Sequence, residues 1–168
     1  MTESDRAQRE AAEAGKADLQ KANLLGHDLR NADLSSANLH HANLRKSRLQ
    51  SANLSGANLH TAALSTADLS DADLTDADLS HAELIGTRLG GACLNGARLH
   101  RATVSKADMT GTDLRTADLS EVINLTCEQL KSAKIDRTTK LPEYIKLDWS
   151  SETDFECRDN KRRINENL

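Results

Sequence analysis

Residues 52–76 read ANLSG ANLHT AALST ADLSD ADLTD, five consecutive copies of one five-residue pattern. The pattern is Ala, then usually Asp or Asn, then Leu and two variable residues. It continues in both directions without insertion or deletion from Ala17 to Glu121, which makes twenty-one copies. Leu is the central residue in every copy except those centred on Val104 and Met109. An internal repeat of this regularity decides the fold class before any other feature of the chain.

Neither a continuous α-helix nor a straight strand can bury a five-residue repeat on one side. Along an α-helix, five residues advance about 500°, so successive Leu side chains drift around the axis by ~140°. Along a straight strand, Ala and Leu share a side, but the next Ala faces the other way. Both conflicts disappear if the chain runs extended for three residues and turns a corner in the next two, where small polar residues are frequent. Repeated corners wind the chain into a β-solenoid whose turns stack ~4.8 Å apart.

Unbroken tandem A(D/N)LXX, as in residues 52–56 and 72–76, resembles the pentapeptide repeat protein family. The resemblance covers residues 17–121, which is 105 of the 168 residues. It implies an all-β solenoid, a right-handed quadrilateral β-helix with four pentapeptides in each coil. The repeat block then makes about five coils, which we expect to be capped by short α-helices. A repeat of this kind specifies the fold far more than the function.

The sequence supports a coil of four pentapeptides independently of the resemblance. If residues twenty apart lie above one another, the inward positions occupied by His27, Ser47 and Thr87 instead of Ala form one column, and only Thr112 lies elsewhere. The outward column of the same face alternates in charge: Asp28, Arg48, Asp68, Arg88, Asp108. Opposite charges are favourable neighbours at strand spacing. A coil of three pentapeptides would scatter both sets.

Four segments are expected along the chain: an N-terminal helical cap over 1–16, the repeat β-helix over 17–121, a C-terminal helical cap over 122–142 and a polar tail over 143–168. Residues 3–14 are rich in Ala, Glu, Arg and Gln and precede Gly15, which predicts a helix with a glycine stop. Thr126 and Gln129 have capping-box spacing and predict the start of a second helix. The charged residues 158–168 are expected to be disordered. The tail either covers the final coil or joins two chains, so a monomer and a homodimer formed through the C-terminal region both remain open.

Composition and charge exclude several classes of protein. The 22 Lys and Arg residues oppose 26 Asp and Glu residues, a net charge of −4, so we expect no direct binding of nucleic acid. No apolar run approaches the ~18–20 residues of a membrane span, and no hydrophobic segment follows Met1, so neither a membrane protein nor a secretory signal is expected. Cys93, Cys127 and Cys157 form an odd, scattered set without paired spacing, which favours a reduced, cytoplasmic setting. A bacterial source is expected as well.

No constellation of catalytic groups is apparent. A prism filled by Ala and Leu leaves no pocket, and the chain has no phosphate loop, metalloprotease helix or nucleophile elbow, so we expect neither an enzyme nor a cofactor. Cys93 is expected to point outward with no base beside it. Five histidines fall on or beside one corner of the coil: His40, His41, His60, His81 and His100.

His40 and His60 are the candidates for a shared Zn²⁺ or Ni²⁺ ion, because imidazoles one coil apart lie close enough to bind one metal. No Cys, Asp or Glu completes a set of four ligands there, and Ser80 interrupts the column. A solvated corner is therefore the favoured interpretation, and no metal site is predicted.

Some members of the family resemble duplex DNA and protect type II topoisomerases such as gyrase from quinolones, which supplies an alternative function, that of a DNA-mimicking regulator. Duplex DNA carries one negative charge per ~1.7 Å of axis. Five coils span about 25 Å, so a faithful mimic of that length would present about 15 negative charges. The block 17–121 holds 13 acids and 10 bases, a net charge of −3. It also lacks the projecting loops and Phe centres of many such members, which places this alternative second.

The segment 49–87 contains no Lys or Arg. Its acids form what we call the acidic belt: Asp68, Asp71, Asp73, Asp76, Asp78 and Glu83. The belt is the predicted contact for a protein partner. The sequence therefore favours a non-enzymatic scaffold or protein-interaction rod and does not identify its partner.

Overall fold

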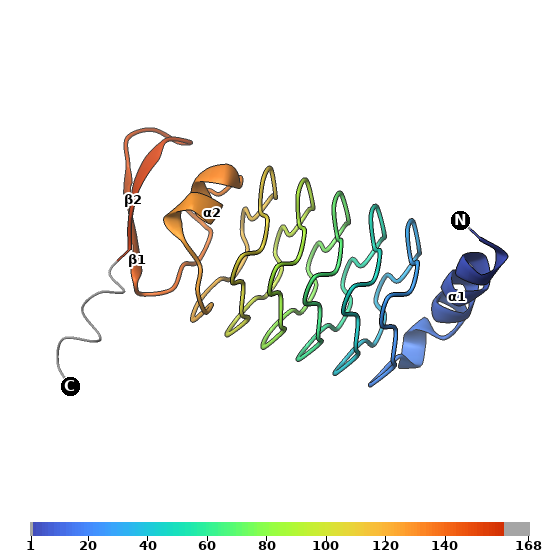
Figure 1. Ribbon diagram of the computed structural model, residues 1–168. Coiled ribbons are helices and arrows are strands. Elements are labelled where there is room, and N and C mark those ends of the chain that lie inside the picture. The colour runs from blue at the N-terminus through green and yellow to red at the C-terminus, as the bar shows by residue number, and fades with distance from the viewer. Residues whose placement is uncertain (1, 160–168) are drawn as a thin grey trace.

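The computed structural model describes residues 2–159 as a rod of stacked coils, with a helix at one end and a helix and a hairpin at the other (Figure 1). In chain order the elements are α1 (Glu3–Ala14), a 3-10 turn (Lys16–Asp18), α2 (Cys127–Ser132), β1 (Ile145–Trp149) and β2 (Phe155–Asp159). The coils occupy the stretch between the 3-10 turn and α2. Within residues 2–159, no helix has the length and apolar character needed to cross a membrane.

Single parallel bridges join residues 20 apart through the repeat block, as between Asn23 and Asn43. At that bridge Leu24 N donates to Asn43 O at 2.8 Å, and Asn43 N donates to Ala22 O at 2.9 Å. Bridged residues are separated by four pentapeptides, so each coil has four sides. The predicted 20-residue coil is confirmed.

Each side of the coil presents one outward column, and we name the faces A to D in the order in which the chain visits them. Face A consists of Asn38, Asn58, Asp78, Arg98 and Asp118, and face B of Asn23, Asn43, Ala63, Glu83, Thr103 and Ile123. Face C consists of Asp28, Arg48, Asp68, Arg88 and Asp108, and face D of Asp33, Asn53, Asp73, Cys93 and Asp113. Face B therefore lies opposite face D. The alternating ladder expected from the sequence is face C.

The inside of the rod is filled by the central residues and the Ala residues of the repeats. From Leu29 to Leu119, every central side chain is at most 1% exposed. The hydroxyls at inward positions donate to backbone carbonyls: Ser47 to Leu44 O at 2.7 Å, Thr87 to Leu64 O at 2.8 Å and Thr112 to Leu89 O at 2.7 Å. These three buried hydroxyls are therefore all satisfied by hydrogen bonds.

The corners use left-handed backbone. The fifth residue of every repeat, from Lys21 to Glu121, has φ between 56° and 70°. Glycine suits this region, yet long side chains occupy it too, as at Lys46 (58°) and His81 (59°). A non-glycine residue there costs roughly 1 kcal/mol. The consequence is that these side chains project from the edges of the rod.

At the N-terminal end, α1 lies beside the first coil (Figure 1). Ala12 is buried, and Glu13 Oε1 accepts a hydrogen bond from Asp33 N at 2.9 Å. Lys16 O accepts one from Asn38 N at 2.8 Å. Lys16 Nζ also lies 2.8 Å from Asp33 Oδ2, and together with Ser35 it lowers the pKa of Asp33 to about 2. Residues of this segment thus satisfy backbone groups that have no preceding coil to pair with.

At the C-terminal end, α2 begins with the expected capping box, in which Thr126 and Gln129 bond reciprocally. The Gln129 side chain has a second role, because its Nε2 donates to Val104 O at 2.9 Å and to Ala107 O at 3.0 Å. These carbonyls belong to the last complete coil. The cap of the helix and the end of the solenoid are therefore joined through one side chain.

A β-hairpin follows, which the sequence analysis does not predict. β1 and β2 pair antiparallel from Ile145↔Asp159 to Trp149↔Phe155. Ile145 is buried, and Tyr144 just before it donates its hydroxyl to Val122 O at 2.7 Å. Residues 158 and 159, expected to be disordered, lie in β2; residues 160–168 lie outside the described part of the chain.

The sequence predicts a reduced setting without paired cysteines, but two of the three cysteines are joined in the structure. Cys127 at the start of α2 forms a disulfide with Cys157 in β2, 30 residues away, and Cys93 is the free thiol. The hairpin folds back on α2, which brings together two residues whose spacing carries no signal. Disulfides persist mainly in oxidising compartments, so this pair counts against the cytoplasmic location. That location stays a prediction.

Candidate functional site

Three members of the acidic belt form ion pairs with arginines of other coils. The closest N···O distances are 3.2 Å between Asp68 and Arg88, 3.2 Å between Asp78 and Arg98, and 2.6 Å between Glu83 and Arg45. Burial alone would raise the pKa of Asp68 and Asp78, but hydrogen bonds from the following serine and the arginine lower it. The belt is therefore partly neutralised by residues that are remote in sequence.

The other three members, Asp71, Asp73 and Asp76, are exposed and gather on face D and its two corners. Among residues 2–159, no Lys or Arg forms an ion pair with any of them. A Cβ atom at Gly91 would collide with Asp71 Oδ1, and one at Gly96 would collide with Asp76 Oδ1. The two corner carboxylates thus rest on glycines of the next coil. We call Asp71, Asp73 and Asp76 the acidic triad.

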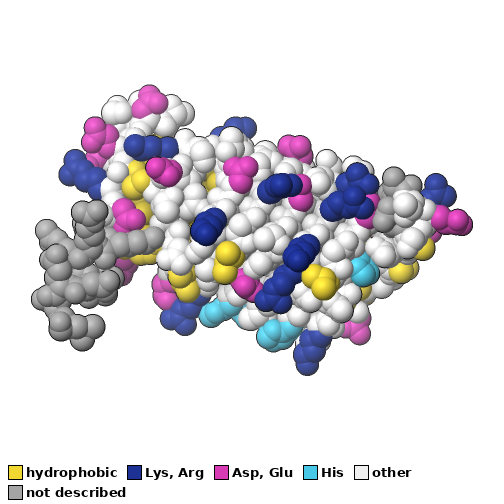
Figure 2. All heavy atoms as spheres, viewed as in Figure 1, with side chains coloured by type: hydrophobic (Ala, Val, Ile, Leu, Met, Phe, Trp, Pro, Cys, Tyr) yellow, Lys and Arg dark blue, Asp and Glu magenta, His cyan; other side chains and the backbone are white. Residues whose placement is uncertain are grey.

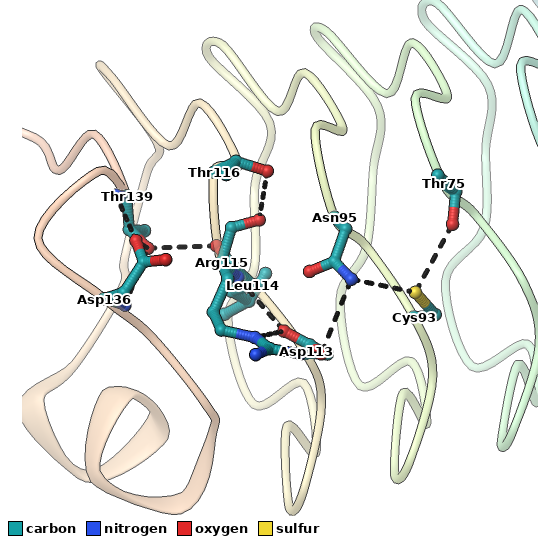
Figure 3. Close-up of polar contacts among 9 residues, drawn as sticks. All are labelled: Thr75, Cys93, Asn95, Asp113, Leu114, Arg115, Thr116, Asp136 and Thr139. Atoms are coloured by element: carbon teal, nitrogen blue, oxygen red, sulfur yellow. Dashed lines mark hydrogen bonds and ion pairs between the residues drawn. The ribbon is translucent and has the colours of Figure 1, made fainter. Parts of the chain in front are cut away.

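Beyond the triad, face D continues through Cys93 to Asp113 (Figure 3). Cys93 Sγ lies 3.3 Å from Thr75 Oγ1, and the side-chain amide of Asn95 lies between Cys93 and Asp113 (Figure 3). Arg115 binds both carboxylate oxygens of Asp113, at 2.9 and 2.6 Å. Thus the negative charge of face D is neutralised toward the C-terminal end, and the Cys93 thiol lies beside the Thr75 hydroxyl and the Asn95 side-chain amide.

On face C, Asp28 is the buried acid of the rod. Its side chain is fully buried and accepts from Arg30 Nε at 2.8 Å, Arg30 Nη2 at 2.6 Å and Arg48 Nη2 at 2.8 Å. Hydrogen bonds from Arg30 outweigh burial and lower the pKa of the Asp28 carboxyl. This arrangement holds a charged group in place and is structural.

We expect Asp28→Asn to destabilise the protein at neutral pH by about 2 kcal/mol, since hydrogen bonds to a charged group contribute roughly 1.5–3 kcal/mol. Because folding lowers the pKa, the wild-type carboxylate stabilises the fold fully above the unfolded pKa of about 3.9 and loses this contribution as the pH falls through the folded pKa. Urea midpoints of both proteins, measured from pH 7 downward, should therefore converge in acid. A gap that stays constant with pH would contradict this account.

The five histidines form one row along the corner between faces A and B, as predicted. Ring centroids of neighbours are 4.1 Å apart for His40 and His41, 5.3 Å for His40 and His60, 5.2 Å for His60 and His81, and 6.1 Å for His81 and His100. Burial lowers the pKa of His41, as do the charges of His40 and Lys21. Within the described part of the chain, no three His, Cys, Asp or Glu residues are arranged to hold a metal ion.

The repeat that builds these faces is the signature of a known family. The sequence model named pentapeptide repeats matches residues 16–50, 52–91 and 82–121, in eight copies. The chain belongs to the pentapeptide repeat family. No curated protein sequence matches this chain.

Solved structures of pentapeptide repeat proteins are similar to this one. Rfr23 from the cyanobacterium Cyanothece 51142 is 34% identical over 56% of this chain and 63% of its own, with a TM-score of 0.51. HetL from Nostoc sp. strain PCC 7120, involved in heterocyst differentiation regulation, is 38% identical over 71% of this chain and 54% of its own, with a TM-score of 0.43. QnrB1, a plasmid-mediated fluoroquinolone resistance protein, is 22% identical over 68% of this chain and 61% of its own, with a TM-score of 0.47. This chain therefore spans less than two thirds of each of these proteins.

One surface of this pentapeptide repeat protein is absent from the sequence analysis, namely face B with its flanking corners. Arg45 crosses the small side chain of Ala63 to reach Glu83, two coils away. Leu25 and Ile85 are exposed in the corner column that also holds Arg45. The signal was available, because these residues align when the repeats are written in rows of twenty.

Proposed function

We propose that this pentapeptide repeat protein is a non-enzymatic protein-interaction rod, a scaffold that presents fixed side-chain columns to a partner. The observation that carries the proposal is the filled interior, in which central side chains from Leu29 to Leu119 are at most 1% exposed. A rod packed in this way offers its surface to other molecules. The strand-like stacking fixes outward side chains at ~4.8 Å intervals, which suits recognition by a complementary surface.

The acidic triad is the proposed contact on face D. Asp71, Asp73 and Asp76 are exposed, lie within six consecutive residues of two adjoining repeats and form no ion pair with a described residue, whereas Asp68, Asp78 and Glu83 are paired with arginines. An unpaired carboxylate attracts a basic partner more strongly than a paired one. We therefore assign the contact to the triad and a supporting role to the rest of the belt.

The test is capture of partners from a lysate of the source cell by the immobilised chain. The variant Asp71→Lys, Asp73→Lys, Asp76→Lys is compared with the control Glu10→Lys, Glu128→Lys, Glu143→Lys, which changes the net charge equally at exposed positions near the two ends. We expect the wild type and the control to retain a common protein. The triad variant should bind that protein at least roughly tenfold more weakly, which corresponds to about 1.4 kcal/mol of binding free energy. Equal retention by all three would remove the triad as the contact.

The same experiment addresses the alternative of a DNA-mimicking topoisomerase regulator. Recovery of gyrase or topoisomerase IV, with inhibition of supercoiling by the wild type and not by the triad variant, would support that alternative. The ion pairs of Asp68, Asp78 and Glu83 count against it, because mimicry requires negative charges that remain exposed along the rod.

A further inference from the structure

Face B and the corner columns on either side of it, which we call strip B, carry the exposed hydrophobic side chains of the rod. Among residues 2–159 the exposed large hydrophobic residues are Leu25 (50%), Ile85 (38%) and Ile123 (47%). Leu25 and Ile85 occupy the same corner column three coils apart, and Ile123 ends the outward column of face B. Single exposed hydrophobic residues are ordinary, so these three bear on function only through the charged side chains that share the strip with them.

Strip B is also positively charged. Its bases are Lys21, Arg45, Lys46, Arg101 and Lys106, and its acids are Glu83 and Glu121. Both acids are paired within the strip, Glu83 with Arg45 at 2.6 Å and Glu121 with Arg101 at 2.7 Å. The three lysines form no ion pair with any residue in 2–159. Figure 2 shows hydrophobic side chains lying between Lys and Arg side chains on the side of the rod that faces the viewer.

We propose that strip B binds an acidic, amphipathic segment of a partner protein. Carboxylates of the segment contact the lysines, and its apolar side chains cover Leu25 and Ile85. This inference rests on the proposed function only in treating the rod as an interaction surface; the strip lies opposite the acidic triad and has the opposite charge. Charge complementarity selects an acidic partner, and the exposed hydrophobic residues favour a partner that also carries apolar side chains.

The spacing of the strip suits an extended segment. Coils stack ~4.8 Å apart, so Leu25 and Ile85 are about 14 Å apart. An extended chain rises about 3.4 Å per residue, so apolar residues four positions apart reach both, and they point to the same side. Lys46 lies one coil beyond Leu25, and Lys106 one coil beyond Ile85. The strip therefore repeats an apolar residue followed by a base.

The probe is a fluorescently labelled synthetic peptide of glutamates with a leucine at every fourth position, titrated with the full chain and followed by anisotropy. We expect the variant Lys46→Glu, Lys106→Glu to bind roughly tenfold more weakly, and the variant Leu25→Ser, Ile85→Ser to lose affinity to a similar extent. The matched control Lys131→Glu, Lys146→Glu makes the same charge change at exposed positions on α2 and β1. It should bind like the wild type, and binding should weaken as salt increases.

Several results would overturn the inference: unchanged binding by the strip variants, equal loss in the control, or equal affinity for a peptide with serine in place of leucine. A labelled single-stranded oligonucleotide that binds as tightly would indicate a general polyanion surface instead. Sedimentation of the chain alone, with a dimer abolished by the strip variants, would identify a second copy as the occupant. Peptide binding without a lysate partner would contradict only the proposed function, whereas a lysate partner without peptide binding would contradict only this inference.

Discussion

Replacing Leu74 with Asp is expected to unfold the repeat block. Leu74 lies in the middle of the rod and is fully buried, with Leu54 and Leu94 in the adjacent coils. The loss of a buried Leu costs about 2–5 kcal/mol, and an unpaired buried carboxylate adds several kcal/mol. The sum is comparable to the whole stability of a typical domain, about 5–15 kcal/mol. Circular dichroism should show that the variant is already unfolded at temperatures where the wild type is folded, and heating it should give no cooperative transition.

Two further variants make this result specific. Thr66→Asp introduces the same charge at an exposed corner of the same part of the rod and should melt like the wild type. Leu74→Ala should still fold but lose about 2–5 kcal/mol, which separates the lost packing from the buried charge. A native-like melt of the Leu74→Asp protein would mean that Leu74 does not point inward, and the register of the whole repeat would be wrong.

Replacing Cys157 with Ser is expected to loosen the hairpin while leaving the coils intact. The disulfide closes a loop with a sequence separation of 30 residues. A cross-link over such a loop removes about 3–4 kcal/mol of chain entropy from the unfolded state. Trp149 is the one tryptophan of the chain, and its ring lies 5.1 Å from the Phe155 ring and 5.3 Å from the Arg137 guanidinium carbon. Its emission should therefore shift to the red at a lower urea concentration in the variant.

Reduction of the wild type with a dithiol should reproduce the Cys157→Ser result, because it breaks the same bond. Cys93→Ser is the control, since Cys93 lies on face D and is not part of the disulfide. It should leave the transition of Trp149 unchanged. If reduction and Cys157→Ser both left that transition unchanged, packing of the hairpin against α2 would suffice and the disulfide would have no stabilising role.

The period of the repeat could be predicted because every copy places Ala and a large apolar residue at the same positions, with few exceptions. Ala and Leu are buried on one side only if the chain makes a corner every five residues. The column of His27, Ser47 and Thr87 indicated that each coil has four corners. The parallel bridges between residues 20 apart confirm that prediction. The capping box of Thr126 and Gln129 was predictable for the same reason, since it joins residues three apart.

The candidate sites depend on contacts between residues that are far apart in the chain. Six acids without a nearby base in sequence looked alike, yet Asp68, Asp78 and Glu83 each meet an arginine of another coil, and only the acidic triad stays unpaired. The grouping of Leu25 and Ile85 with lysines arises in the same way.

The coil, its inward residues and the row of histidines could be predicted from the amino-acid order alone, because a strict period converts position in the chain into position in space. Contacts between distant residues set which charges are paired, which hydrophobic residues share a strip, and that Cys127 meets Cys157. Beyond residue 121 the period ends, so the path of the chain depends on how α2 and the hairpin pack against the last coil. Such packing depends on many weak contacts between distant residues, and no local pattern encodes it.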